Sequence, residues 1–360
     1  MGAPSAPGWT YARSGVDRSS VAASLARLLS QIRSRPKPSH GRALDLPGHY
    51  AGLVRIGRET IAITTDTVGT KGLLAEEVGD WEGVGEDIVA VNVNDLASVG
   101  ARPSALVDCL SISAPSPEAF EQIGRGLDRG LRASGMSLLG GETAVVPELV
   151  HGYDLGGTAI GFFPKGRRPV TGALLRPGDR VIGIPSNGVH ANGMTLVRRL
   201  LREHHVDLAR PRPGGMEPIG RELLRPTRIY SPQSEALAGR PEVQAFAHIS
   251  GGGVRNLARL SARVAFVLDG WPPVPALFRW IQELGGISPR EMFETFNMGI
   301  GFAVVVRPHR LSETLRRLAR SGAADAVLLG RVERGAGVRL PSHDLVFHGY
   351  SEPAAPERAP

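Results

Sequence analysis

The stretch that decides the fold is Ile61-Ala62-Ile63-Thr64-Thr65-Asp66-Thr67-Val68-Gly69-Thr70-Lys71. It begins with a short alternating β-pattern and then gathers an acid, a glycine, a hydroxyl and a lysine within a few residues. A strand that ends in such a cluster delivers it to the rim of a sheet, where ligands bind. Asp66 suits a hard cation, Gly69 lets backbone N–H groups approach phosphate oxygens, and Lys71 supplies a mobile positive charge. The stretch favours a metal–nucleotide site, although a plain strand-ending turn fits the same residues.

Length, composition and charge bound the class of protein. The chain has 360 residues, of which 42% are hydrophobic and 5% aromatic, and this suits two domains better than one core. The formal net charge is +7 and the pI is about 10.1. The basic residues are mostly scattered arginines without interleaved aromatics, so we expect small anionic ligands and no nucleic acid.

Cysteine usage and hydropathy indicate the compartment. Cys109 is the only cysteine, so no disulfide forms within the chain, as is typical of the reducing cytosol. No apolar run approaches the length that spans a membrane, and the first residues lack a charged-then-apolar signal pattern. We therefore expect a cytoplasmic protein without membrane contact.

Periodicity and turn residues predict alternating strands and helices. Ser116-Pro117-Glu118 is a strong helix start, and Gly135 is the matching stop. A helical pattern near the N-terminus carries Val21, Leu25, Leu28, Leu29 and Ile32. The run 87–99 leaves helix and strand open, because its apolar residues fit both periods. The expected strands are 53–56, 60–65, 105–110, a segment within 153–163, 180–185, 264–268, 301–306 and, as the last one, 327–332.

Composition shifts divide the chain into segments. We expect a disordered N-terminus (1–10), a first domain (11–168), a second domain (169–345) and a flexible tail (346–360). The Gly-, Pro- and Arg-rich stretch 164–177 is the domain boundary.

Three expected turns offer acids beside glycines or amides, namely Asp66, Asp95 and Glu142. Carboxylates brought together bind Mg²⁺, which prefers oxygen ligands, although each acid taken singly is more simply a helix cap or an Asx turn. The sequence contains no Walker-type phosphate loop, no Gly-x-Gly-x-x-Gly after a strand, no Cys/His cluster and no Gly-x-Ser-x-Gly. Standard nucleotide loops, zinc sites and serine hydrolases are therefore disfavoured.

Seven motifs, in order along the chain, together resemble the phosphoribosylformylglycinamidine cyclo-ligase (AIR synthetase) family. They are Asp66–Lys71, Val93–Leu96, Gly140–Ala144, Ser186–Gly193, Pro226–Tyr230, His248–Gly253 and Phe296–Gly301. The resemblance runs from about Tyr11 to about Val332. The first three motifs are shared with a superfamily that includes FGAM synthetase, selenophosphate synthetase, thiamine-monophosphate kinase and a hydrogenase-maturation enzyme. Pro226–Tyr230 and Phe296–Gly301 point to the cyclo-ligase itself.

This resemblance implies a fold and a reaction. The fold is a two-domain α/β (α+β) architecture, each domain a mixed sheet packed with helices, with N-terminal sheets pairing in a homodimer. The reaction is ATP-dependent cyclisation of formylglycinamidine ribonucleotide (FGAM) to 5-aminoimidazole ribonucleotide (AIR) through an iminophosphate, with release of ADP and phosphate, in purine biosynthesis. ATP and Mg²⁺ are the implied cofactors.

The resemblance also implies roles for individual residues. His190, Asp95 and Lys71 are implied as catalytic, with His190 moving a proton or steadying developing charge. The implied metal ligands are Asp66, Asp95 and Glu142. The implied nucleotide contacts are Asp66, Gly69, Thr70, Lys71, Asn94, Gly141, Glu142 and Thr143. The implied substrate contacts are His190, Asn192, Gly251, Gly252 and Gly253.

Two departures from the family pattern leave alternatives open. Thr67 stands where the family has glycine, and residues 46–52 are poor in glycine where the family covers ATP with a glycine-rich segment. One alternative is another ATP-phosphorylating member of the superfamily, with selenophosphate synthetase disfavoured because no cysteine lies near the N-terminus. The other is a catalytically silent ATP-binding homologue, against which the retained acids and Lys71 argue.

Overall fold

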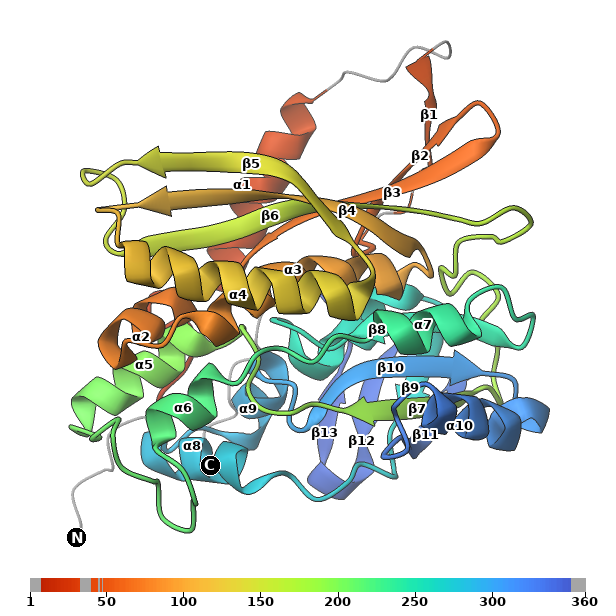
Figure 1. Ribbon diagram of the computed structural model, residues 1–360. Helices are drawn as coiled ribbons and strands as arrows, with labels where there is room; N and C mark the ends of the chain where they lie inside the picture. The colour runs from red at the N-terminus through yellow and green to blue at the C-terminus, as the bar shows by residue number, and fades with distance from the viewer. Residues whose placement is uncertain (1–7, 33–39, 45, 47, 351–360) are drawn as a thin grey trace, which may run out of the picture.

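Two sheets organise the molecule, one in each half of the chain. The computed structural model describes residues 8–32, 40–44, 46 and 48–350. Within these residues the N-terminal half carries a six-stranded sheet in the order β1-β2-β3-β6-β4-β5. The C-terminal half carries a seven-stranded sheet in the order β13-β12-β9-β11-β7-β10-β8, and the two sheets stack with helices between them (Figure 1). The expected α/β class with two mixed sheets is confirmed.

The N-terminal half contains α1 (Arg18–Gln31), β1 (Arg42–Leu44), β2 (Gly52–Ile56), β3 (Glu59–Thr67), α2 (Lys71–Val78), α3 (Glu82–Ser98), β4 (Arg102–Ile112), α4 (Pro117–Ser134), β5 (Ser137–Val145) and β6 (Tyr153–Phe162). Helix α4 joins the parallel strands β4 and β5, as a crossover connection must. Its predicted ends are confirmed, because Ser116 accepts a hydrogen bond from the N–H of Ala119 (3.3 Å) and Gly135 adopts φ 68°.

The run 87–99, which periodicity left open, is helical. It belongs to α3, which contacts β3, β4 and β6 on one side and β8 and α7 on the other. Figure 1 shows α3 between the N-terminal sheet and the C-terminal elements β8 and α7. A helix packed on both sides is apolar nearly all round, so its sequence lacks the one-sided period that would have identified it. Of its buried polar residues, Asp87, Asn94 and Ser98 bond to the second domain, whereas Asn92 bonds to the first.

The C-terminal half contains β7 (Arg180–Pro185), α5 (Met194–Glu203), α6 (Ile219–Leu224), α7 (Ser231–Leu237), β8 (Val243–His248), η2 (Gly253–Leu260), β9 (Val264–Val267), α8 (Ala276–Gly285), α9 (Pro289–Thr295), β10 (Ile300–Val306), η3 (Pro308–Arg310), α10 (Leu311–Arg320), β11 (Val327–Arg334), β12 (Gly337–Leu340), η4 (Pro341–His343) and β13 (Leu345–Phe347). The expectation that 327–332 is the last strand is wrong, because Gly337 adopts φ 83° and two further strands follow. Every residue of β10 is buried, between β7 and β8.

Both ends of the described chain are more ordered than we expected. The N–H of Trp9 donates to the carbonyl of Gly285 (3.0 Å), so the disorder expected for residues 8–10 is wrong. The start of the expected tail is wrong as well, since β13 pairs with β12 through residue 347. The remaining parts of these two expectations, 1–7 and 351–360, lie outside the described residues.

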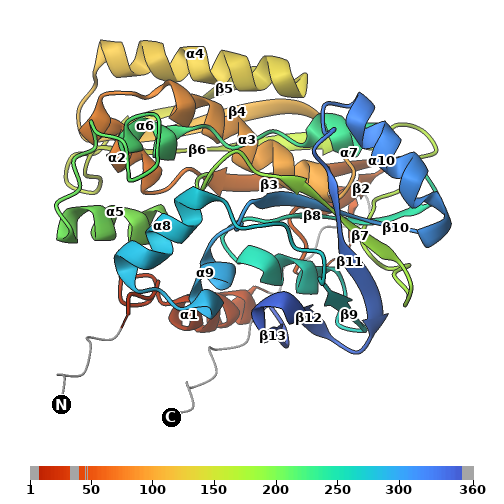
Figure 2. The same cartoon turned by 90° about the horizontal axis from the view of Figure 1, so that it is seen from below.

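Two apolar surfaces stay uncovered. Helix α1 forms as predicted but buries none of its residues, and its apolar row faces solvent at the edge of the molecule away from α4 (Figure 2). The N-terminal sheet is covered by α3 and α4 on one face only. The other face exposes Ile63, Val107, Ile160 and Phe162. None of the helices in the described part of the chain is long and apolar enough to cross a membrane.

Candidate active site

Asp66 and Asp95 are brought together where α3 packs against the end of β3. Asn92 fixes this contact, because its side chain accepts a hydrogen bond from the N–H of Asp66 (3.0 Å) and donates one to the carbonyl of the same residue (3.3 Å). Asp95 follows Asn92 by one turn of the helix and so lies on the same face. Burial, and then the charge of Asp95, raise the pKa of Asp66 to about 6, against smaller lowering effects of the Thr67 N–H and His248. The two carboxylates form a pair of like charges.

His248 reaches this pair from the C-terminal sheet. It ends β8, and its Nδ1 lies 3.1 Å from Oδ1 of Asp95. Its backbone N–H donates to Oγ of Ser98 at 3.1 Å, so α3 and β8 are joined at two points. The sequence placed His248 in a motif without giving it a role. Nothing in the local pattern of β8 indicates that this strand ends opposite Asp95.

Glu142 does not join the acid pair. It lies within β5, as do Gly141 and Thr143, so the expectation of a turn there is wrong; Asp66 and Asp95 also lie in a strand and a helix. The register pairs Glu142 with Cys109, Cys109 with Gly156, and Gly156 with Thr67. Glu142 therefore shares the face of Thr67, opposite to that of Asp66, because side chains alternate along a strand. Among the described residues no group of three acidic, histidine or cysteine side chains is placed to hold a metal.

Asp108 is a carboxylate that the sequence did not single out. It lies in the same row as Asp66, with Gly157 between them in the sheet. A Cβ at Gly141 would stand 1.5 Å from Oδ1 of Asp108, so only glycine leaves room for this side chain. Burial raises the pKa of Asp108. The expected nucleotide contact Gly141 thus has a packing reason in this structure.

The loop from Ser186 to Gly193 follows β7 and carries His190. The amide of Asn187 donates to the carbonyl of Pro226 (2.8 Å), and its Oδ1 lies 3.0 Å from Nε2 of His190. His190 is only 3% exposed and adopts φ 67°, which a side chain other than glycine rarely does. Burial, followed by the charges of His248, Lys71 and Arg228, holds the pKa of His190 well below its ordinary value. The imidazole is neutral at physiological pH.

Asn192 meets the glycine turn that follows β8. A Cβ on Gly251 would lie 2.7 Å from Oδ1 of Asn192, so these two residues are neighbours. Gly253 adopts φ 55°, and a Cβ there would lie 2.0 Å from the carbonyl of Phe293. The structure therefore brings Asn192 close to Gly251, and both belong to the expected substrate contacts. Asn297 instead accepts from Ser186 Oγ (2.8 Å) and donates to the carbonyl of Gly188 (2.9 Å), which fits a structural role in this loop.

Two expected nucleotide contacts are engaged elsewhere. Lys71 is fully buried, with Nζ 2.5 Å from Oδ2 of Asp87, so the expectation of a mobile charge is wrong. The side chain of Asn94 donates to the carbonyl of Arg228 (2.9 Å) and accepts from the N–H of Tyr230 (2.8 Å). Thr70 Oγ1 lies 2.9 Å from Oγ1 of Thr195, and Gly69 adopts φ 64° with open space around it. Of the Asp66–Lys71 motif, Asp66, Gly69 and Thr70 remain open to a ligand.

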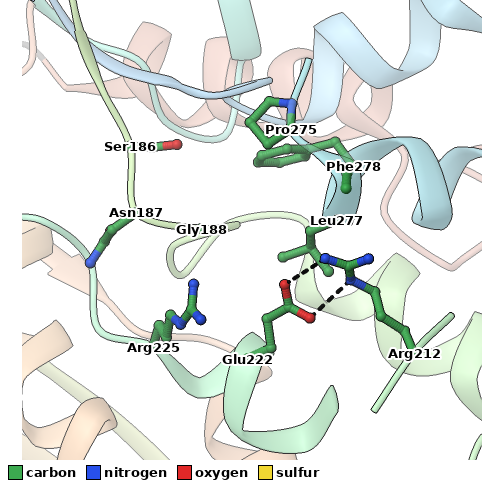
Figure 3. A pocket seen from close by; sticks show the side chains of 10 residues that line it. Ser186, Asn187, Gly188, Arg212, Glu222, Arg225, Pro275, Leu277 and Phe278 are labelled. Carbon is green, nitrogen blue, oxygen red and sulfur yellow. Dashed lines mark hydrogen bonds and ion pairs between the residues drawn. The ribbon is translucent and has the colours of Figure 1, made fainter. Parts of the chain in front are cut away.

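A cavity of about 230 Å³ lies on the other side of the His190 loop. Its lining is Ser186, Asn187, Gly188, Arg212, Glu222, Arg225, Pro275, Ala276, Leu277 and Phe278. Figure 3 shows the paired side chains of Arg212 and Glu222 on one side and Pro275 and Phe278 on the other. Arg212 donates two hydrogen bonds to Glu222 (2.9 and 3.0 Å), so these two charges cancel. The cavity does not contain the acid pair, and we place the chemistry at the acids.

Comparisons with known proteins identify the family. Residues 48–163 match the family model described as "AIR synthase related protein, N-terminal domain", and residues 176–342 match the corresponding C-terminal domain. The phosphoribosylformylglycinamidine cyclo-ligase of Thermococcus gammatolerans is 42% identical over 346 residues, which cover 93% of this chain and 99% of that protein. The chain belongs to the phosphoribosylformylglycinamidine cyclo-ligase family.

Solved structures share the fold of this cyclo-ligase family member at much lower identity. A chain of the HypE–HypF complex aligns with a TM-score of 0.63 and 18% identity, covering 88% of this chain and 95% of that one. AaThiL complexed with AMPPCP and TMP aligns with a TM-score of 0.61 and 19% identity, covering 92% and 95%. At these identities the likeness shows the fold alone. The family resemblance predicted from the motifs is confirmed.

Proposed function

We propose that this chain converts FGAM into AIR, using ATP and releasing ADP and phosphate. The observation that carries the proposal is the pair of Asp66 and Asp95, held together at the junction of the two sheets in a cyclo-ligase family member. The glycine turn and Asn192, which lie together on the C-terminal side, support a substrate site next to it. The nucleotide analogue in AaThiL supports ATP as the phosphoryl donor for this fold.

The donor set of the acid pair fits Mg²⁺. Both groups are oxygen ligands, and a cation between them would relieve the repulsion that helps raise the pKa of Asp66. Bound Mg²⁺ would neutralise the phosphates of ATP during transfer. His248 would fix the carboxylate of Asp95, as outer partners of metal ligands do. Glu142 is not included as a ligand within the same subunit, because it lies on the opposite face of the sheet.

The proposed reaction has two bond-forming steps. The formyl oxygen of FGAM attacks the γ-phosphorus, ADP leaves, and the formamide N–H proton is lost, which gives an iminophosphate. The ribosyl-bearing amidine nitrogen then attacks the former formyl carbon, the C–O bond to phosphate breaks, and this nitrogen loses its proton as the ring closes. A proton then moves from the ring methylene carbon to the exocyclic imine nitrogen, which gives the aminoimidazole. Both steps depend on alignment and charge neutralisation more than on a protein nucleophile.

In this scheme Gly69 and Thr70 would contact the phosphates of ATP, and the turn Gly251–Gly253 with Asn192 would hold the substrate. Backbone N–H groups of a glycine turn suit its 5′-phosphate. His190 is buried and bonded to Asn187, so we assign it to holding the loop that presents Asn192 rather than to direct proton transfer.

We also propose a homodimer formed through the bare face of the N-terminal sheet. Ile63 pairs directly with Ile160, and both are exposed in the isolated chain together with Val107 and Phe162. An apolar sheet face of this kind is typical of an interaction site. The variant Ile160→Glu should convert the dimer to a monomer in light scattering. The Phe162→Tyr variant keeps the ring and should stay dimeric; a monomeric wild type would contradict the proposal.

The reaction is tested by incubating the protein with FGAM, ATP and MgCl₂ and following AIR and ADP together. We expect AIR and ADP in equal amounts, and neither without FGAM. ADP formed with another phosphate acceptor but not with FGAM would favour a different ATP-phosphorylating member of the superfamily. ATP binding without any turnover would favour a silent homologue.

A further inference from the structure

Lys71 and Asp87 form a buried ion pair between the start of α2 and the first turns of α3. Nζ lies 2.5 Å from Oδ2, and both side chains are 0% exposed. A buried charge is tolerated when its remaining hydrogen-bonding positions are also filled. In this pair a main-chain group of the second domain supplies one further partner to each side chain.

The segment 225–227 supplies these main-chain partners. Nζ of Lys71 donates to the carbonyl of Arg225 at 2.7 Å, and Oδ1 of Asp87 accepts from the N–H of Thr227 at 2.7 Å. Further along the same face of α3, Asn94 holds the carbonyl of Arg228 and the N–H of Tyr230. The pair therefore belongs to a row of contacts through which the first domain fixes the position of the segment 225–230 in the second.

The next contact leads from this segment to the His190 loop. Pro226 lies between the two held residues, and its carbonyl accepts from the amide of Asn187 (2.8 Å). Because a carbonyl only accepts, Asn187 must turn Nδ2 toward Pro226 and Oδ1 toward His190. Nε2 of His190 therefore carries the hydrogen in this contact (3.0 Å). These contacts connect Lys71 and Asp87 to the His190 loop through the segment 225–227.

We propose that Lys71 and Asp87 are positioning residues, which set where the second domain holds the His190 loop, and that Lys71 does not contact the nucleotide. A side chain with no exposed surface and two oxygen partners has no face left for a phosphate. The pair would act on turnover through alignment, since displacing a reacting group by about 1 Å costs on the order of 100-fold in rate.

The test compares Lys71→Met with a matched variant, Arg307→Met. Arg307, whose side chain is 15% exposed, pairs with the fully buried Asp179 (2.8 Å to each carboxylate oxygen), but both residues lie in the C-terminal domain. Affinity for AMPPCP with MgCl₂ is measured by calorimetry, and AIR formation by its kcat. We expect Lys71→Met to keep its nucleotide affinity within about twofold and to lose about 100-fold in kcat. Arg307→Met should lose stability but neither activity nor affinity.

A tenfold or larger loss of AMPPCP affinity in a folded Lys71→Met protein would overturn the proposal, because that is the result expected of a phosphate ligand. If the single variant does not fold, the double variant Lys71→Met/Asp87→Leu leaves no unpaired buried charge and is the one to measure. It should fold and bind AMPPCP, but kcat should stay low because the carbonyl of Arg225 and the N–H of Thr227 lose their partners. Normal kcat in the double variant would also overturn the proposal.

The proposal rests on the proposed function only for the kcat readout. Failure of the wild type to make AIR is therefore distinguishable from a loss of nucleotide affinity.

Discussion

Two pairs of charged residues lie where the β3–α2 corner packs against α3, and their charges are arranged in opposite ways. Asp66 and Asp95 are like charges, partly exposed, and held together by Asn92. Lys71 and Asp87 are opposite charges, fully buried, and each is also bonded to a main-chain group of the second domain. Only four residues stand between Asp66 and Lys71 in one motif, yet of these two charged side chains only that of Asp66 is available to a ligand.

The difference shows that charged residues of one motif can serve different purposes, either ligand binding or alignment of the domains. Like charges held close raise the free energy of the folded state, and the arrangement makes sense where a cation is to be bound. A buried opposite pair adds little net stability over an apolar one, but it demands one geometry of its partners. The acid pair thus serves chemistry and the buried pair serves alignment, and each can be broken separately.

Breaking the acid pair should have the largest effect. Asp95→Asn removes a charge that would hold the metal, so we expect turnover to fall roughly 1,000-fold, since metal catalysis contributes several kcal/mol at about 1.36 kcal/mol per tenfold. The fold should remain, because asparagine still accepts the contact from His248. AIR formation and the melting temperature are the two measurements. Near-normal turnover would sink the assignment of Asp95 to the metal.

Breaking the buried pair should act on stability first. Asp87→Ala leaves the ammonium of Lys71 buried and unpaired, and we expect a loss of about 3–5 kcal/mol in the free energy of unfolding. Urea unfolding measures this loss. The control is Glu121→Ala, which removes a partner of Arg125 on the surface of α4; an exposed pair contributes less than about 1 kcal/mol. Equal effects of the two substitutions would contradict the difference between the pairs.

Much of the fold could be predicted from the sequence, because strands with a clear alternation of apolar and polar residues and helices with capping residues are recognisable from local sequence. The helix after Ser116 and the strand before Asp66 are examples. Helix α3 could not be assigned, since burial on both sides removes the period that marks a surface helix. The last two strands were missed because they are short and follow a bend at residues 335–336.

The candidate site was predictable only in its residue types. The face that Glu142 occupies depends on a register shift, since Leu106 pairs with Leu138 but Asp108 pairs with Gly141. One extra residue in a strand moves every later side chain to the other face, and no local pattern announces it. The side chains that reach across domains, such as Lys71 and Asn94, are equally hidden, because their partners lie far along the chain.

The smallest expected effect is the pH dependence of stabilisation by Mg²⁺, which involves the acid pair and not the buried pair. The pKa of Asp66 is raised from 3.8 to about 6, first by burial and then by Asp95. A raised pKa means that the folded state binds the proton more tightly, so this contribution to stability is complete below pH 3.8 and is lost as pH rises through 6. Mg²⁺ and the proton compete for the same oxygens, so Mg²⁺ should stabilise the fold above pH 6 and do so much less at pH 5.

Thermal unfolding with and without MgCl₂ at pH 5 and pH 7.5 measures this competition. A tenfold excess over Kd stabilises the folded state by about 1.4 kcal/mol, which corresponds to a rise of roughly 3 °C. We expect that rise at pH 7.5 only, and its loss in Asp66→Asn. The folded Lys71→Met variant should keep this rise in melting temperature at pH 7.5, because the buried pair takes no part in holding the cation. A rise of equal size at both pH values would mean that Mg²⁺ binds away from Asp66, and the contrast between the two pairs would then no longer separate chemistry from alignment.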